Sequence, residues 1–127
     1  MRPLLHPSME DVTVAALLHA LADPVRVAIY AELAVADGAT CCSSFLQVSE
    51  RKIPKSTLSQ HFRALREAGL IRSERHGVEM HNVTRCEELN RRFPGLIPAI
   101  LSAHRIEATG QVPTPKHKAV KRRSKLG

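Results

Sequence analysis

Two of the three cysteines in the sequence, Cys41 and Cys42, are adjacent, and the third is Cys86. Thiolates bind soft ions such as arsenite or mercury and react with oxidants, so these residues are candidates for a metal, arsenic or redox sensor. Adjacent side chains point about 100° apart in a helix and to opposite faces in a strand. The neighbouring thiols could therefore reach one ion only from an irregular loop, and a purely structural role for all three stays open.

A second group of residues has side chains suited to reading DNA. In the segment IPKSTLSQHFRALREAGLI, Leu58, Phe62 and Leu65 have the spacing of one helical face, and Pro54 and Gly69 predict a helix over residues 54–68. Short polar and basic side chains surround its first turns, where a helix can approach base edges and phosphates. The residues predicted to contact DNA from this helix are Lys55, Ser56, Thr57, Ser59, Gln60 and Arg63.

Two neighbouring features complete this region. His61 lies beside the apolar side of the helix, so we expect it to pack and hydrogen-bond at the domain's edge rather than bind a ligand. The following segment, IRSERHGVEMHNVT, predicts a β-hairpin over residues 72–82 with His76-Gly77 at its tip. Its candidate contacts to phosphate or the minor groove are Arg72, Arg75 and His76, unless Glu74 and Glu79 only balance these charges.

Two helices are expected before this region. The first covers residues 12–21, with Ser8 and Asp11 at the spacing of a capping box. It is apolar nearly all round and should be buried in a core or against a partner subunit. The second opens at Asp23-Pro24 and runs to Gly38. A short helical turn is expected over residues 43–48.

After the hairpin, Thr84 and Glu87 again have the spacing of a capping box, which predicts a helix through Leu89 and Phe93. Prolines 94 and 98 then interrupt, so the run GLIPAIL forms a second helical piece or a kink. We expect one folded domain over residues 8–107, followed by a basic and disordered tail over residues 108–127.

The net charge of +7 is concentrated in that tail. Its last segment has six Lys and Arg residues and no acidic residue, which leaves 7 − 6 = +1 for the rest of the chain. Such a tail could bind a polyanion or simply keep the protein soluble. The start of the sequence lacks the apolar run of a signal peptide, and no stretch reaches the ~18 apolar residues of a membrane span. We therefore expect a cytoplasmic protein with no membrane partner.

The stretches LADPVRVAIYAEL and KSTLSQHFRALREAGLIRSERHG resemble the ArsR family of bacterial transcriptional regulators. The resemblance implies a mainly α fold with a small β-hairpin, a winged helix-turn-helix. It also implies a homodimer joined through its N- and C-terminal helices, a partner in double-stranded operator DNA, and release or switching by an unknown effector. We expect the dimer contacts at Leu17, Leu18, Phe93, Leu96, Ile97, Ile100 and Leu101.

Two alternatives follow from the same residues. Metal-sensing members of the family have a C-x-C motif, which the adjacent pair Cys41-Cys42 does not reproduce, so the thiol sensor is a hypothesis and no metal site is assigned. A winged helix can also serve protein–protein assembly without binding DNA. The sequence has no nucleophile elbow, zinc-protease motif or phosphate-binding glycine loop, so we expect neither an enzyme nor a cofactor.

Overall fold

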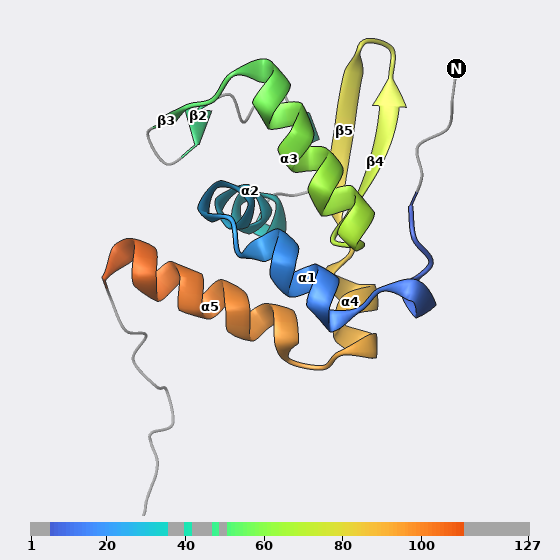
Figure 1. Cartoon of the computed structure of the whole chain (residues 1–127), viewed down its shortest axis with the longest axis vertical. Coiled ribbons are helices and arrows are strands. Elements are labelled where there is room, and N and C mark those ends of the chain that lie inside the picture. The colour runs from blue at the N-terminus through green and yellow to red at the C-terminus, as the bar shows by residue number, and fades with distance from the viewer. Residues whose placement is uncertain (1–5, 36–39, 42–46, 49–50, 111–127) are drawn as a thin grey trace, which may run out of the picture.

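The structure is a computed structural model of the whole chain, and it describes residues 6–35, 40–41, 47–48 and 51–110. A long antiparallel hairpin extends from a body of helices (Figure 1). The elements are the 3₁₀ helix η1 (Met9–Asp11), the helices α1 (Val14–Leu21) and α2 (Pro24–Val35), the strands β1 (Thr40–Cys41), β2 (Gln47–Val48) and β3 (Arg51–Lys52), the helix α3 (Lys55–Ala68), the strands β4 (Ile71–His76) and β5 (Glu79–Thr84), and the helices α4 (Cys86–Arg92) and α5 (Leu96–Thr109).

Helix α1 is capped by Thr13, whose side chain accepts a hydrogen bond from the N–H of Ala16 at 3.1 Å. This bond satisfies one of the amide groups that a helix start leaves open. The predicted cap at Ser8 is wrong, because the Ser8 hydroxyl donates to the Asp11 carboxylate at 3.0 Å. Ser8 precedes η1, and Asp11 is the last residue of η1.

Helix α2 begins at Asp23-Pro24 as predicted. The Asp23 carboxylate accepts hydrogen bonds from the N–H groups of Val25 at 2.8 Å and Arg26 at 3.1 Å. Arg26 in turn donates to the carbonyl of Ala20 near the end of α1 at 2.7 Å. Helices α1 and α2 bend by 102° at their junction, and among the described residues no single helix is long and apolar enough to cross a bilayer. The predicted end at Gly38 lies outside the described residues.

The helix predicted over residues 54–68 is confirmed as α3. Leu58, Phe62 and Leu65 all point into the core and are at most 2% exposed. Gly69 ends the helix with φ 92°, a left-handed conformation that glycine adopts without a steric penalty. A Cβ at this position would collide with the side chain of Val12. Close packing at the helix end therefore also requires a residue without a side chain.

Short strands lie between α2 and α3. Strands β2 and β3 pair antiparallel, with Gln47 opposite Lys52 and Val48 opposite Arg51. The helical turn predicted over residues 43–48 is therefore wrong for Gln47 and Val48, because their backbone groups bond to a neighbouring strand. The remainder of that turn lies outside the described residues.

The hairpin is confirmed, with a shifted tip. Strands β4 and β5 pair from Ile71 opposite Thr84 to His76 opposite Glu79, so the turn is Gly77-Val78 and not His76-Gly77. Strand β1 adds to the other edge of β5, which gives the sheet order β1-β5-β4. This third strand was not predicted.

One face of the hairpin packs on the helical body through buried polar residues. Ser73 donates from its hydroxyl to the side-chain oxygen of Asn82 at 2.7 Å, and the two residues are 4% and 0% exposed. Arg66 of α3 donates to the same Ser73 hydroxyl at 3.4 Å. The first bond joins the two strands of the hairpin, and the second links α3 to it.

The segment before α1 holds the base of the hairpin. His6 accepts, at Nε2, the backbone N–H of Ser73 at 3.0 Å, and Arg85 donates to the carbonyl of Pro7 at 2.8 Å. Arg85 also donates to Glu88 at 2.9 Å. This hydrogen bond is the main reason that the pKa of Glu88 lies below its ordinary value, with Arg72 contributing.

Helices α4 and α5 close the body from below in Figure 1. The predicted capping box at Thr84 is wrong, because Thr84 ends β5 and Arg85 precedes α4 without a side-chain cap. The second helical piece expected after Pro94 is confirmed as α5, and Pro98 lies in its first turn, where a missing N–H is tolerated. Helix α5 continues to Thr109.

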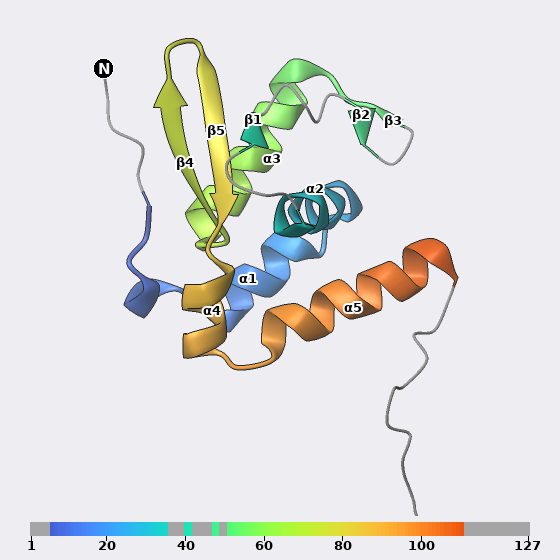
Figure 2. The ribbon, with the colours of Figure 1, turned by 180° about the vertical axis from the view of Figure 1, so that it is seen from behind.

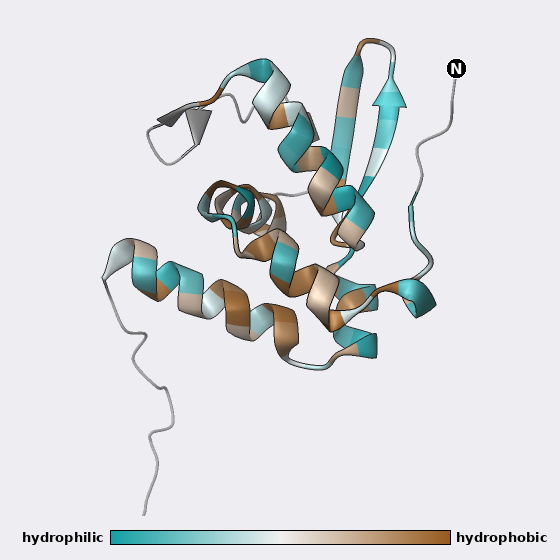
Figure 3. Ribbon diagram, in the orientation of Figure 1, coloured by the Kyte–Doolittle hydropathy of each residue, from teal (hydrophilic) through white to brown (hydrophobic). Residues whose placement is uncertain are grey.

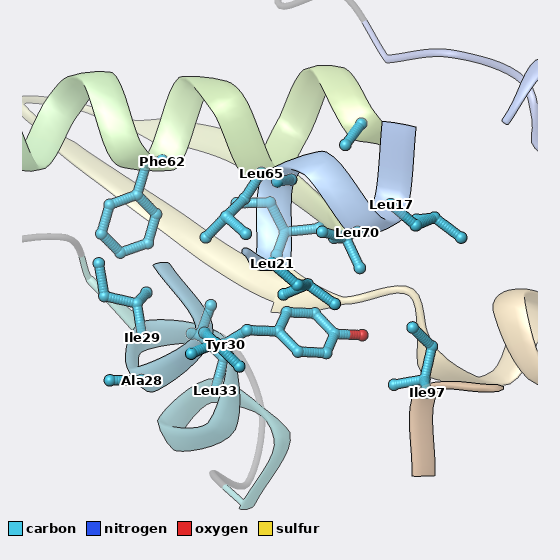
Figure 4. Close-up of a cluster of buried hydrophobic side chains, with 14 of the residues drawn as sticks. Leu17, Leu21, Ala28, Ile29, Tyr30, Leu33, Phe62, Leu65, Leu70 and Ile97 are labelled. Carbon is cyan, nitrogen blue, oxygen red and sulfur yellow. The ribbon is translucent and has the colours of Figure 1, made fainter. Parts of the chain in front are cut away.

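The core lies between α1, α2, α3 and α5 and is aliphatic apart from Tyr30 and Phe62 (Figure 4). Both aromatic side chains are almost fully buried, at 0% and 2% exposure. Burying a side chain of this kind stabilises the folded state by roughly 1.5–3 kcal/mol. The other core residues labelled in Figure 4 are aliphatic and come from all four helices, apart from Leu70, which lies just before β4.

Candidate nucleic-acid interface

The exposed face of α3 is polar along its first turns. Leu58, Phe62 and Leu65 fix its orientation by packing inward, so the intervening side chains must point to solvent. Every predicted DNA-contact residue on this helix is exposed except Thr57, which is half-buried. These residues are Lys55, Ser56, Thr57, Ser59, Gln60 and Arg63.

The N-terminal end of α3 and the tip of the hairpin lie on the same side of the molecule, opposite α5 (Figures 1 and 2). The hairpin is mostly hydrophilic, whereas apolar residues concentrate on α1 and the first half of α5 (Figure 3). The molecule therefore presents two polar projections together, a helix end and a two-stranded ribbon, at one pole. A ribbon beside a helix of this kind can flank a DNA groove that the helix enters.

The basic side chains predicted for this surface differ in their surroundings. Arg63 pairs with Glu67 at 3.0 Å, and both are well exposed, so the pair is weak and its arginine can turn to a phosphate. Arg72 lies near the base of the hairpin and pairs with Glu88 of α4 at 3.3 Å, which favours a structural role. Arg75 is exposed near the tip, and no ion pair to it forms within the described part of the chain.

One of the predicted wing residues, His76, contacts a glutamate of its own strand. Its Nε2 lies 2.9 Å from a carboxylate oxygen of Glu74. His81 was not singled out from the sequence, yet its Nε2 lies 3.0 Å from Glu79 and its ring stacks on that of His76. The alternation of residues along each strand could have predicted that these four side chains share one face.

His61 packs at the domain's edge as expected, but the expected hydrogen bond is absent at one of its nitrogens. Its Nδ1 is buried without a hydrogen-bond partner among the described residues. His61 follows Gln60 on α3 and contributes to lowering the pKa of Asp23.

The residues predicted to form a dimer fall into three groups by their exposure. Leu17 and Ile97 are 0% and 2% exposed, so they belong to the core of the protomer and cannot contact a partner subunit directly. Leu18 is 48% exposed on α1, and Val14 beside it is 39% exposed. The other predicted residues are half-buried on or before α5, and these are Phe93, Leu96, Ile100 and Leu101.

The thiol hypothesis falls only partly within the described residues. Cys42 and the side chain of Cys41 lie outside them. Cys86 is half-buried on the wall of an open pocket of about 560 Å³ between α2, α4 and α5, and its sulfur is 3.1 Å from the hydroxyl of Tyr30. Burial, together with this contact, raises the pKa of Tyr30 well above its ordinary value, so the phenol stays protonated and can donate to the sulfur.

Within the described part of the chain, no three His, Cys, Asp or Glu side chains are grouped so that they could hold a metal ion. Among the described residues, Cys86 therefore lacks the additional ligands that a thiolate metal site would require.

Comparison with known protein families agrees with this geometry. The model of a helix-turn-helix domain family matches residues 21–74, which extend from the end of α1 through α3 into β4. No curated protein matches the chain significantly. The chain thus carries a helix-turn-helix domain of the kind found in DNA-binding regulators, and its antiparallel hairpin fits the winged form of that fold.

Proposed function

We propose that this protein is a homodimeric transcriptional regulator of the ArsR type that represses transcription by binding operator DNA. Helix α3 enters the major groove with its N-terminal turns, and the β4–β5 hairpin lies against the adjoining backbone or minor groove. Gln60 is suited to a bidentate contact with adenine through its side-chain amide. Ser56 and Ser59 contact bases or phosphates, whereas Lys55, Thr57 and Arg63 contact phosphates.

The observation that carries this proposal is the division of α3 into two faces. Its leucines and Phe62 are buried against the body, whereas most polar residues of its first turns are exposed. The N-terminal end of the helix lies at the same pole as the hairpin tip (Figure 1). A solvated helix face alone would be uninformative. The bond from Arg66 to Ser73 adds support, because it links the helix directly to the hairpin.

A two-fold dimer is the second part of the proposal. The half-buried apolar residues of α5 and the exposed Leu18 and Val14 of α1 offer a surface away from the pole formed by α3 and the hairpin. Two-fold symmetry would place the two recognition helices about one DNA turn, ~34 Å, apart on a roughly palindromic operator. An effector that binds better to another dimer arrangement would release the DNA.

The variant Ser59→Ala plus Gln60→Ala tests the reading role of α3. Both residues are exposed, so the fold should persist while operator contacts are lost. Losing a good base contact costs about 1–3 kcal/mol, which corresponds to roughly 5- to 150-fold weaker binding. Fluorescence anisotropy with the operator and an unrelated duplex measures the change.

Ser8→Ala, at an exposed serine before α1, serves as the matched control and should bind like the unaltered protein. The role of α3 is refuted if the double variant keeps the same preference for the operator over the unrelated duplex.

A further inference from the structure

The outer face of the hairpin holds four titratable side chains in contact. Register places Glu74 opposite His81 and His76 opposite Glu79, so all four residues project from the same face. The two imidazole rings stack with their centroids 4.4 Å apart and their planes at 24°. Each histidine also bonds through Nε2 to the glutamate of its own strand, at 2.9 Å for His76 and 3.0 Å for His81.

These contacts determine where an additional proton would go. An ionised carboxylate can only accept hydrogen bonds, so each Nε2 must carry the proton that it shares with its glutamate. The free acceptor of each neutral ring is then Nδ1. Protonation there turns the hydrogen bond to glutamate into a stronger, charge-assisted one. Histidine is the side chain whose charge ordinarily changes between pH 5 and 8.

The charge of the hairpin depends on these two rings. Over residues 71–84 the permanent charges are Arg72 and Arg75 against Glu74 and Glu79, which sum to 2 − 2 = 0. Protonating both histidines would raise the sum to +2. Arg72 is moreover engaged by Glu88. The remaining neighbour across the sheet is strand β1, whose Cys41 lies opposite His81 in register.

Apart from Arg75, the hairpin has no permanent positive charge that is not engaged by a carboxylate, so proton uptake would strengthen its attraction to phosphates. DNA has a strong negative potential, which favours the cationic form of any histidine close to it. The histidine–glutamate contacts offer that form a ready hydrogen-bond partner. Protonation of one histidine makes protonation of the other less favourable, because two positive charges would then lie in stacked rings 4.4 Å apart.

We propose that the His76–His81 pair makes DNA binding proton-linked, so that the hairpin gains positive charge as it docks against the phosphate backbone. This inference rests on the proposed DNA-binding function. Because the complex binds more protons than the free protein, affinity must rise as pH falls from 8 to 6. One linked proton changes affinity by at most about tenfold per pH unit.

Calorimetric titration of the full chain with a mixed-sequence DNA duplex at low salt tests the proposal. Backbone contacts dominate such binding, so the operator sequence is not needed. Repeating the titration at pH 7 in phosphate and in Tris, whose ionisation enthalpies differ, gives the number of protons taken up. We expect net uptake and an affinity that is several-fold higher at pH 6 than at pH 8.

The variant His76→Gln plus His81→Gln should lose most of this uptake and pH dependence. Both side chains lie on the outer face, so a thermal melt should show an intact fold. His19→Gln, an exposed histidine on α1, is the matched control and should keep both effects.

Equal heats in the two buffers, or uptake that persists in the double variant, would overturn the proton linkage while leaving DNA binding standing. Absence of duplex binding at every pH would instead refute the proposed function together with this inference.

Discussion

Asp23 connects the start of α2 with the pH dependence of stability. Burial by itself would raise the pKa of its carboxyl, but the net direction is downward. The N–H groups of Arg26 and Val25 bond to the ionised form, and the positive charges of Arg26 and His61 favour it further. A carboxyl whose pKa is lowered on folding stabilises the protein above its unfolded pKa, and this contribution is lost as pH falls through the folded value.

Replacing Asp23 by Ala should therefore lower the free energy of unfolding by about 1 kcal/mol at pH 7, because the helix cap is lost. Asn keeps an acceptor oxygen without a charge, so Asp23→Asn should be milder. The difference between the original protein and the Asn variant should shrink as pH falls below about 4. Urea unfolding at pH 7 and pH 3 measures both effects, and a difference that grows on acidification would contradict this role.

His81, Cys86 and Tyr30 show why single residues were hard to place from the sequence. The bond between Tyr30 and Cys86 joins residues 56 positions apart, and no local pattern encodes such a contact. His81 belongs to no recognisable motif. Its spacing of two residues from Glu79 does, however, predict that both side chains lie on the same face of a strand.

At the scale of elements, Gly69 and Gly77 both have a positive φ, yet their surroundings differ. A Cβ at Gly69 would meet the side chain of Val12 in the core, whereas a Cβ at Gly77 would meet nothing within 4 Å. The first glycine is needed for conformation and packing, and the second for conformation alone.

We expect Gly77→Ala to cost about 1 kcal/mol and Gly69→Ala roughly 2–4 kcal/mol, as the latter adds overpacking to backbone strain. Thermal or urea unfolding of the two variants compares them directly. Equal losses would show that Val12 can move away at little cost.

Helices α2 and α3 and the hairpin were predictable, because Asp23-Pro24, the spacing of Leu58, Phe62 and Leu65, and Gly69 are local signals. The two predicted capping boxes, at Ser8 and at Thr84, do not form, because both residues make other hydrogen bonds. Thr84 is held in the ladder with Ile71, and the Ser8 hydroxyl bonds to Asp11. The pairing of β1 with β5 depends on distant residues, so sequence periodicity could not reveal it.

For the molecule as a whole, charge is a weak guide to the DNA-binding face. Six of the seven excess positive charges lie in the tail, outside the described residues, and its contribution to DNA binding stays a prediction. The position of side chains is more informative. The pole with α3 and the hairpin is polar, whereas α1 and α5 hold apolar side chains that the protomer leaves partly exposed.

If α1 contributes to a dimer, Leu18→Glu should weaken self-association, because a charge would replace an apolar side chain that is 48% exposed. Burying the carboxylate of a glutamate in an interface without a partner charge costs free energy, because the charge loses its hydration. Sedimentation equilibrium measures the dissociation constant. Val78→Glu at the hairpin tip makes the same kind of change at a fully exposed site and should leave association unaltered. An unchanged dissociation constant for Leu18→Glu would exclude α1 from the interface.

Sequence-specific DNA binding can be measured by anisotropy titration of the protein with the region immediately upstream of its gene. The titration should be run against an unrelated duplex at two salt concentrations. We predict tighter binding to the upstream region and an affinity for both duplexes that falls steeply with salt, since phosphate contacts release counterions. Absence of binding to the upstream region at low salt would contradict the account and favour a winged helix used for protein assembly.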